Sequence, residues 1–264
     1  YVRVNTLRGD LPHFVADLEK AGIAYRVVED VPACVEILAP AELKKQEKAL
    51  QTRYYPQDLA SQYACRALEA RPGDRVADVC AAPGGKSLTV AQYMENTGAI
   101  FSGDLYPAKC DILTRRAADM GATVMQAVCR DASQPPPAEW VGTFDRVICD
   151  APCSGLGVIR RKPEIRYKSL EELAALPPLQ LTILEEAAKL VKPGGVLQYS
   201  TCTLNPAENG EVAQKFLAAH PEFSPRPLPG VPESVLSEPD WCRTLFPFAH
   251  KTDGFFIAGF QKNV

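Results

Sequence analysis

The sequence has no long apolar run, little net charge and few histidines, and each shortage excludes a class of protein or site. No stretch reaches the roughly 18 uninterrupted apolar residues of a membrane helix, so we predict no membrane span. The net charge is only −3, so total charge does not indicate a nucleic-acid-binding protein, although local clusters still can. No signal peptide is visible, and the chain starts at Tyr1 without a methionine, so we expect further sequence upstream.

The nine cysteines are an odd number, and none belongs to a C-x-x-C pair. In a chain of 264 residues this usage indicates reduced thiols in the cytoplasm and argues against a disulfide framework. The three histidines, His13, His220 and His250, belong to no motif. We therefore expect a cytoplasmic protein without a metal site, and we expect it to act as a monomer.

The first part of the chain predicts a small α/β subdomain over residues 1–50. A helical pattern covers residues 11–21, with Asp10 as its N-cap and Gly22 as its stop. Residues 41–58 predict a polar connection, and a helix is predicted over residues 59–68. Short strands are predicted at residues 2–5, 25–28 and 34–38.

Residues 51–264 form the second predicted domain, in which strands and helices alternate from residue 75 onward. This alternation is typical of an α/β fold with a parallel sheet that helices cover on both faces. Residues 221–240 predict an irregular segment, and residues 254–261 predict an antiparallel strand near an edge of the sheet. The predicted strands cover residues 75–80, 99–104, 123–128, 144–150 and 195–201, and the predicted helices cover residues 86–95, 107–120, 178–191 and 207–220.

The stretch at residues 78–87, D-V-C-A-A-P-G-G-K-S, joins the first of these strands to the first helix. Its glycines let the backbone approach a ligand closely, and the helix N-terminus presents free N–H groups. The stretch therefore predicts a site for a nucleotide-like cofactor at the carboxyl end of a central strand. It matches neither the Walker loop nor G-x-G-x-x-G, and a tight turn without a ligand is the alternative interpretation.

A polar or reactive side chain stands at the end of each predicted strand, where ligands of open α/β sheets bind. An acid at the end of the second strand is well placed to accept hydrogen bonds from ribose hydroxyls. Any one acid could be a loop cap, but several at corresponding positions favour a site. These residues are Asp78, Asp104, Asp131, Asp150 and Cys202.

Two cysteines, Cys153 and Cys202, occupy polar loops at strand ends. The other seven lie in apolar or amphipathic stretches and are predicted to be mostly small core residues, with Cys80 a partial exception because it opens the cofactor turn. A thiol near its reference pKa of about 8.5 is mostly protonated at neutral pH, so a catalytic thiol needs help from its surroundings. The sequence by itself does not rank the two cysteines.

Three motifs in this order, D-V-C-A-A-P-G-G-K-S, D-A-P-C-S-G and S-T-C-T, resemble the signature of the RNA cytosine-C5 methyltransferases of the Nol1/Nop2/Sun family. The starting R-V-N-T, the Y-P-Q-D at residues 55–58 and the G-F-F at residues 254–256 also fit, so the resemblance covers essentially the whole chain. The stretch G-V-I-R-R-K-P-E-I-R at residues 157–166 looks most like the bacterial Sun/Fmu type (RsmB), which modifies small-subunit ribosomal RNA. That type usually carries an N-terminal NusB-like RNA-binding domain, which this sequence does not contain.

The resemblance implies a Rossmann-like methyltransferase domain that uses S-adenosylmethionine. It implies that Cys202 is the nucleophile that attacks cytosine C6 and that Cys153 assists product release. It also implies that Asp104 holds the cofactor's ribose, that Asp131 lies near the adenine and that Asp150 lies between cofactor and base. The implied cofactor loop consists of Cys80, Ala81, Ala82, Pro83, Gly84, Gly85 and Lys86.

A basic cluster follows the Cys153 loop, with Tyr167 interleaved. Such a run is usually a solvated face, but beside a base-modifying site it predicts a track for RNA phosphates. The cluster consists of Arg160, Arg161, Lys162, Arg166 and Lys168.

The expected function is methyl transfer to C5 of a cytosine in RNA, with small-subunit ribosomal RNA as the substrate. The alternatives are the same chemistry on transfer RNA and a non-catalytic, cofactor-binding RNA assembly factor. A DNA cytosine methyltransferase is disfavoured because such enzymes carry the nucleophile in a Pro-Cys loop, at the place of Cys153, and lack the Thr-Cys motif.

Overall fold

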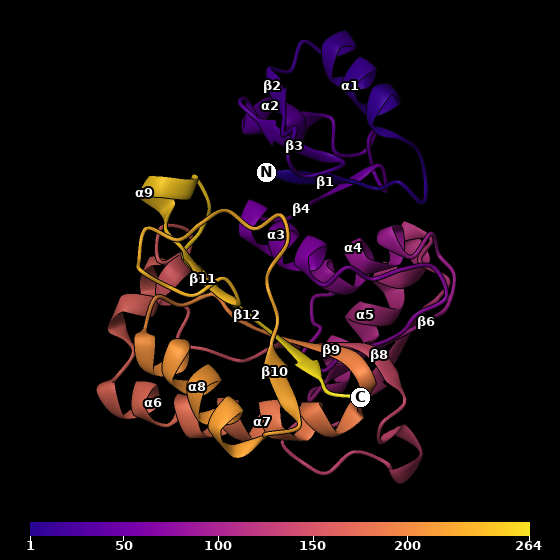
Figure 1. Ribbon diagram of the computed structural model, residues 1–264. Helices are drawn as coiled ribbons and strands as arrows, with labels where there is room; N and C mark the ends of the chain where they lie inside the picture. The colour runs from indigo at the N-terminus through magenta and orange to yellow at the C-terminus, as the bar shows by residue number, and fades with distance from the viewer.

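The protein is described by a computed structural model that covers the backbone of residues 1–264 and every side chain except that of Leu170. It contains a small antiparallel sheet and a larger mixed sheet (Figure 1). The small sheet has the strand order β2-β3-β1-β4. Its strands are β1 (Val2–Val4), β2 (Tyr25–Val27), β3 (Cys34–Ile37) and β4 (Tyr54–Pro56).

Helix α1 (Leu11–Lys20) packs on the small sheet and buries Phe14 and Leu18 against the strands. The predicted N-cap is confirmed, since the Asp10 side chain accepts a hydrogen bond from the backbone N–H of His13 at 2.9 Å. Capping of this kind satisfies one of the N–H groups that have no partner inside the helix. The small unit thus has its own apolar core.

The prediction of a plain polar connection over residues 41–58 is wrong. This segment contributes most of α2 (Pro40–Lys45) and the whole of β4, which pairs with β1. Leu43 and Leu50 pack into the core of the small unit and Tyr55 of β4 is also buried, but these few apolar residues in a Lys- and Gln-rich stretch give too weak a periodicity to reveal the elements. The division of the chain into domains at residue 50 stays a prediction.

The larger sheet has the order β10-β12-β9-β8-β5-β6-β7, and β11 pairs with β12 outside this path. The pairs among β5 to β9 are parallel, as predicted. The predicted bounds agree fully with the observed ones for β6 and β8. The strands are β5 (Arg75–Asp78), β6 (Ala99–Asp104), β7 (Met125–Cys129), β8 (Phe144–Asp150), β9 (Val191–Thr201), β10 (Phe223–Pro225), β11 (Cys242–Leu245) and β12 (Phe255–Lys262).

Helices cover both faces of this sheet, as Figure 1 shows. One face carries α3 (Leu59–Ala67), α4 (Gly85–Tyr93) and α5 (Pro107–Met120), and the other carries α7 (Leu176–Leu190) and α8 (Gly210–Ala219). Each face has its own apolar core. The shorter helices are η1 (Ala138–Trp140), η2 (Leu156–Val158), η3 (Pro163–Tyr167), α6 (Leu170–Ala174), η4 (Pro206–Glu208) and α9 (Pro247–His250).

The C-terminal strand β12 pairs antiparallel with β9, which confirms the prediction for residues 254–261. The interpretation of residues 221–240 as wholly irregular is wrong at one point, because β10 lies there and forms the sheet edge. Strand β10 contains Pro225. Because proline has no backbone N–H to donate, it occurs in sheets mainly on edge strands or at bulges, and β10 is an edge strand.

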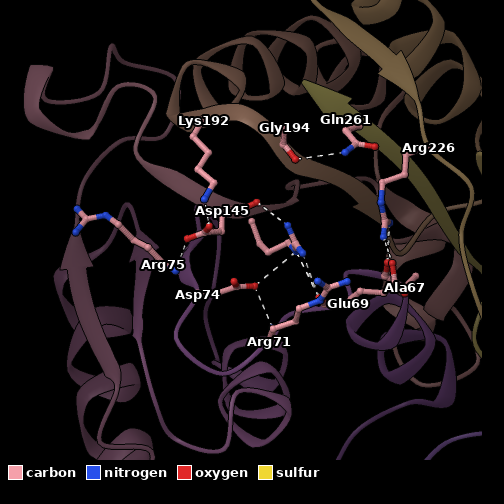
Figure 2. A network of polar contacts seen from close by, with 11 residues as sticks. Ala67, Glu69, Arg71, Asp74, Arg75, Asp145, Lys192, Gly194, Arg226 and Gln261 are labelled. Atoms are coloured by element: carbon pink, nitrogen blue, oxygen red, sulfur yellow. Dashed lines mark hydrogen bonds and ion pairs between the residues drawn. The ribbon is translucent and has the colours of Figure 1, made fainter. Parts of the chain in front are cut away.

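The amino ends of the central strands are closed by a polar network (Figure 2). The Asp145 carboxylate accepts a hydrogen bond from the Arg75 backbone N–H at 2.8 Å and forms an ion pair with Lys192. Arg226 donates to the Ala67 carbonyl oxygen at 2.9 Å and pairs with Glu69. The charged side chains at the amino ends of the strands are therefore paired with one another. Ligands of open α/β sheets bind at the opposite end, beyond the carboxyl ends of the strands.

Candidate active site

The predicted cofactor loop runs from the end of β5 to the start of α4. The Ala81 backbone N–H donates to the Gly103 carbonyl oxygen at 2.7 Å, so the loop lies directly over β6. Gly84 is the N-cap of α4 with φ +96°, a left-handed conformation that glycine adopts without strain. A Cβ atom at Gly84 would lie 3.0 Å from the Leu113 side chain, so packing as well as backbone conformation favours glycine there.

A cavity of about 480 Å³ opens at the carboxyl ends of the strands. This volume is within the range of about 300–1,000 Å³ that is usual for cofactor and ligand pockets. The predicted site residues that line it are Cys80, Ala82, Asp104, Asp131, Asp150, Cys153 and Cys202. The chain therefore brings together side chains that its sequence distributes over more than 100 residues.

Two acids, Asp104 and Asp131, line the part of this cavity that lies beyond the carboxyl ends of β6 and β7. Asp104 is 7% exposed, and its Oδ1 accepts from the Tyr106 backbone N–H at 3.2 Å and lies 3.4 Å from the Lys109 Nζ. Asp131 Oδ1 accepts from the Ser133 hydroxyl at 2.7 Å and from its backbone N–H, and these bonds lower the pKa of Asp131. Both carboxylates are thus fixed in place with oxygens that line the cavity.

An ion pair spans the middle of the site, where Lys86 Nζ lies 2.6 Å from Asp150 Oδ2. The other carboxylate oxygen of Asp150 accepts from the Ser200 hydroxyl at 2.7 Å. Burial by itself would lower the pKa of Lys86, but the charge of Asp150 and the hydrogen bond to it outweigh burial and raise that pKa. Lys86 is therefore held as a cation beside the reactive thiols.

The two loop cysteines meet, with their Sγ atoms 3.3 Å apart. The hydrogen bond from Cys153 lowers the pKa of Cys202, and the positive charge of Lys86 acts in the same direction against burial and the charge of Asp150. The same bond, with burial, raises the pKa of Cys153 well above its ordinary value. Cys202 is therefore the more acidic thiol of the pair and Cys153 the less acidic one, an asymmetry that the sequence by itself does not show.

Close backbone packing holds the Cys153 loop against the Cys202 loop. The Gly157 N–H donates to the Cys202 carbonyl oxygen at 3.0 Å, and the Gly254 N–H donates to the Gly157 carbonyl oxygen at 2.9 Å. A Cβ atom at Gly157 would overlap the Gly254 carbonyl group and lie 2.8 Å from the Cys202 carbonyl oxygen. The G-V-I-R-R and G-F-F motifs therefore meet because their glycines allow backbone contact.

A second cavity of about 230 Å³ lies on the other side of the cofactor loop and shares Cys80, Ala82 and Asp150 with the first. Ala81, Pro83, Gly85 and Lys86 of the predicted loop line this cavity, whereas Gly84 lines neither. The site thus extends across the loop on both sides.

Two buried polar atoms at this second cavity have no hydrogen-bond partner among the described residues, namely Gln57 Nε2 and Asp78 Oδ1. Gln57 Nε2 lies next to the N-terminus of α4, 3.6 Å from where a Cβ atom of Gly85 would be. Burial raises the pKa of Asp78 to about 7. Arg116, which donates to the Pro83 carbonyl oxygen at 3.1 Å, adds a half-buried cation. Donors and acceptors placed together in this way suit a ligand group that carries both charges.

The predicted basic track is only partly available to a ligand. Arg160 Nε lies 2.9 Å from Asp253 Oδ1, and Arg161 pairs with the same carboxylate, which is buried. Lys168 Nζ donates to the Ser154 carbonyl oxygen at 2.8 Å and so supports the Cys153 loop. Arg161 lines the second cavity, and neither described cavity includes the other four basic residues.

Arg166 and Lys162 are the remaining members of the track. The Arg166 guanidinium lies 4.9 Å from the centre of the Tyr167 ring, and Tyr167 is 75% exposed. Lys162 is exposed and forms no ion pair with the described side chains. A role of this cluster in RNA binding stays a prediction, with Lys162 and Arg166 as its most accessible cations.

The sequence gives little indication of several buried polar residues that support the site. Glu208 and Gln180 hydrogen-bond to the Cys153 loop, and Asn209 hydrogen-bonds to the Thr201 hydroxyl and the Thr203 carbonyl oxygen. Gln57 belongs to the Y-P-Q-D motif, which is the one sequence signal that could have placed it here. The prediction that the other seven cysteines are mostly core residues is confirmed for five of them, whereas Cys80 is partly exposed and Cys129 is exposed at the end of β7.

The described residues also bear on other classes of site. Among them, no helix is long and apolar enough to cross a membrane. The same residues contain no group of three or more His, Cys, Asp or Glu side chains arranged to hold a metal ion.

Comparisons with known proteins agree with this geometry. The profile of the family described as 16S rRNA methyltransferase RsmB/F matches residues 65–261. A methyltransferase homolog from Pyrococcus horikoshii superposes with a TM-score of 0.85 at 30% identity, covering 99% of this chain and 85% of that one. This similarity bears out the predicted Rossmann-like fold with a small additional sheet.

Curated relatives include enzymes that act on two kinds of RNA. The probable ribosomal RNA small subunit methyltransferase B of Bacillus subtilis is 42% identical over 212 residues, covering 78% of this chain and 47% of the relative. The mouse tRNA (cytosine(72)-C(5))-methyltransferase is 33% identical over 226 residues, covering 81% of this chain and 44% of the relative. The chain spans about half the length of these relatives. The matched profile covers most of the chain, which therefore belongs to the RsmB/F branch of the S-adenosylmethionine-dependent RNA cytosine-C5 methyltransferases.

Proposed function

We propose that this protein transfers a methyl group from S-adenosylmethionine to C5 of a cytosine in small-subunit ribosomal RNA. The observation that carries the proposal is the pair of thiols 3.3 Å apart at the edge of a cofactor-sized cavity, with Asp150 beside them. Addition to C6, methylation at C5 and release need one nucleophile and one group that acts later, and two thiols with opposite pKa shifts fit those two needs.

The residues present fit S-adenosylmethionine. Asp104 at the end of β6 would accept hydrogen bonds from the ribose hydroxyls, and Asp131 would lie near the adenine. The second cavity would hold the amino-acid end, whose carboxylate suits Gln57 Nε2 and the α4 N-terminus and whose ammonium group suits Asp78. When bound, the cofactor supplies an electrophilic methyl group.

The chain's own residues would then act in sequence on the cytosine. The Cys202 thiolate adds to C6, which turns C5 into a nucleophile that can take the methyl group. Asp150, held by Lys86 and Ser200, would orient the base at its N3 edge. Cys153, once its own S–H proton has passed to water, would take the C5 proton, and the electron pair of the C5–H bond would then expel the Cys202 thiolate and release the methylated base.

The choice of ribosomal RNA rests on the family profile, on the Bacillus relative and on the basic stretch at residues 157–166. Transfer RNA is the alternative substrate, which the mouse relative supports. We place the reaction in the cytoplasm, where nine unpaired cysteines stay reduced, and we propose that the protein acts as a monomer.

A methyl-transfer assay with radiolabelled cofactor tests the proposal. The protein should label small-subunit ribosomal RNA or an assembly intermediate, and bisulfite sequencing of RNA from cells with and without the gene should locate one lost modification. Preferential labelling of transfer RNA would show that transfer RNA, and not ribosomal RNA, is the substrate. Binding of cofactor and RNA without any labelling would instead support an assembly factor without turnover, although two intact cysteine motifs argue against that role.

A further inference from the structure

We propose that Glu208 is a positioning residue that fixes the Cys153 loop relative to the Cys202 loop, an inference that rests on the proposed function. Glu208 ends η4, six positions after Cys202 in the chain, and its side chain is 0% exposed. It touches neither of the described cavities, so it would act through the two thiols and not on the substrate.

The Glu208 carboxylate joins the two loops directly. Its Oε2 accepts a hydrogen bond from the Ser154 backbone N–H at 2.8 Å, immediately after Cys153 in the chain. The same oxygen accepts from Gln180 Nε2 at 2.9 Å, and Gln180 Nε2 also donates to the Pro152 carbonyl oxygen at 3.0 Å. The backbone on both sides of Cys153 is therefore tied to one carboxylate.

The other carboxylate oxygen connects to the segment that follows Cys202. Oε1 accepts from Asn205 Nδ2 at 3.0 Å, and the backbone carbonyl of Glu208 accepts from the Tyr199 hydroxyl on β9. The Ser154 and Thr203 hydroxyl oxygens lie 2.6 Å apart and join the loops a second time. Glu208 is thus the one charged member of the described bonds between these loops.

A carboxylate at this place is costly unless its surroundings compensate for it, because burying an ionised group away from water is strongly unfavourable. Its three side-chain hydrogen bonds come from amide or backbone N–H donors, and no described cation forms an ion pair with it. Bonds to a charged acceptor are shorter and stronger than neutral ones, so they hold the loop more rigidly than an amide would. Rigidity matters here because the S–H of Cys153 must stay within reach of the Cys202 sulfur.

Glu208→Gln tests the inference, because it keeps the size of the side chain but removes its charge. It also replaces one accepting oxygen by an N–H₂ group, which cannot accept hydrogen bonds from the N–H donors around it. The pH dependence of iodoacetamide alkylation at Cys202, assigned by peptide mass spectrometry, should move upward by about one pH unit. At pH values below the wild-type pKa of Cys202 this shift lowers the thiolate fraction by up to about tenfold, since one pKa unit is a factor of ten. The affinity for S-adenosylmethionine, measured by calorimetry, should not change.

Glu211→Gln is the matched control, because Glu211 is exposed and its one ion pair is with Lys215 at 4.0 Å. It should leave the alkylation profile unchanged. If Glu208→Gln does not fold, Gln180→Met removes one shared donor and should move the profile in the same direction by less. A folded Glu208→Gln or Gln180→Met with the wild-type alkylation profile would overturn the inference. Alkylation needs no RNA, so this result is independent of whether the wild-type protein methylates ribosomal RNA.

Discussion

Replacing Cys153 by alanine should have two separable effects on the reaction. The variant loses the S–H group that lies 3.3 Å from the Cys202 sulfur, and it loses the group proposed to act after methyl transfer. The first effect slows the addition of Cys202 to the base. The second leaves the methylated base attached, so a covalent RNA–protein complex should accumulate even though it forms more slowly.

The size of the first effect follows from the hydrogen bond. A bond to a charged group contributes about 1.5–3 kcal/mol, and a thiol is a weak donor, so the low end applies. Since one pKa unit corresponds to about 1.36 kcal/mol, the pKa of Cys202 should rise by about one unit. The thiolate is the form present above the pKa, so addition should slow by up to about tenfold at pH values below the wild-type pKa and recover as the pH rises through the new value.

A denaturing gel of protein incubated with labelled RNA and cofactor over a range of pH measures both effects. Cys153→Ala should give a shifted band, Cys202→Ala should give none, and the double variant should also give none because addition comes first. Cys129→Ala, which removes an exposed thiol that lines neither described cavity, should behave like the wild type. A band with Cys202→Ala and none with Cys153→Ala would reverse the two roles and refute the argument from the thiol pair.

Two further predictions concern the ligands. Asp104→Ala should weaken binding of S-adenosylmethionine about tenfold or more, because charge-assisted bonds contribute about 1.5–3 kcal/mol, and unchanged affinity in calorimetry would contradict the assignment to the ribose. Lys162→Ala should lower the slope of log RNA affinity against log salt by about 0.7, the value for one lost single-strand phosphate contact, whereas Arg161→Ala should lower it less because Asp253 already pairs with Arg161. An unchanged slope for Lys162→Ala would mean that this part of the cluster is a solvated face.

The sequence was sufficient to predict the architecture of the larger sheet and which residue types stand at its carboxyl edge. Strands β6 and β8 have the predicted bounds because each ends in an acid, Asp104 or Asp150, directly before a loop. The parallel α/β sheet follows from local information, namely the alternation of strands and helices, and the glycine-containing turn after β5 predicts a cofactor loop, whereas the Rossmann-like methyltransferase fold came from the family resemblance. Elements held mainly by distant contacts, such as β4 and β10, were missed because three residues carry too little periodicity to identify them.

Only the tertiary structure decided which side chains meet. Cys153 and Cys202 are 49 positions apart in the chain, and Lys86 and Asp150 are 64 apart, yet β8 lies between β5 and β9 and brings all four to one edge. Sequence spacing does not specify such distances, so it could not show that the two thiols lie in contact. It also could not show that Arg160 and Arg161 pair with Asp253, because an exposed charge and a paired one look alike in a sequence. The motifs of the sequence predicted which residue types form the site. The pKa of each of these groups depends on neighbouring side chains, and only the folded structure shows which neighbours those are.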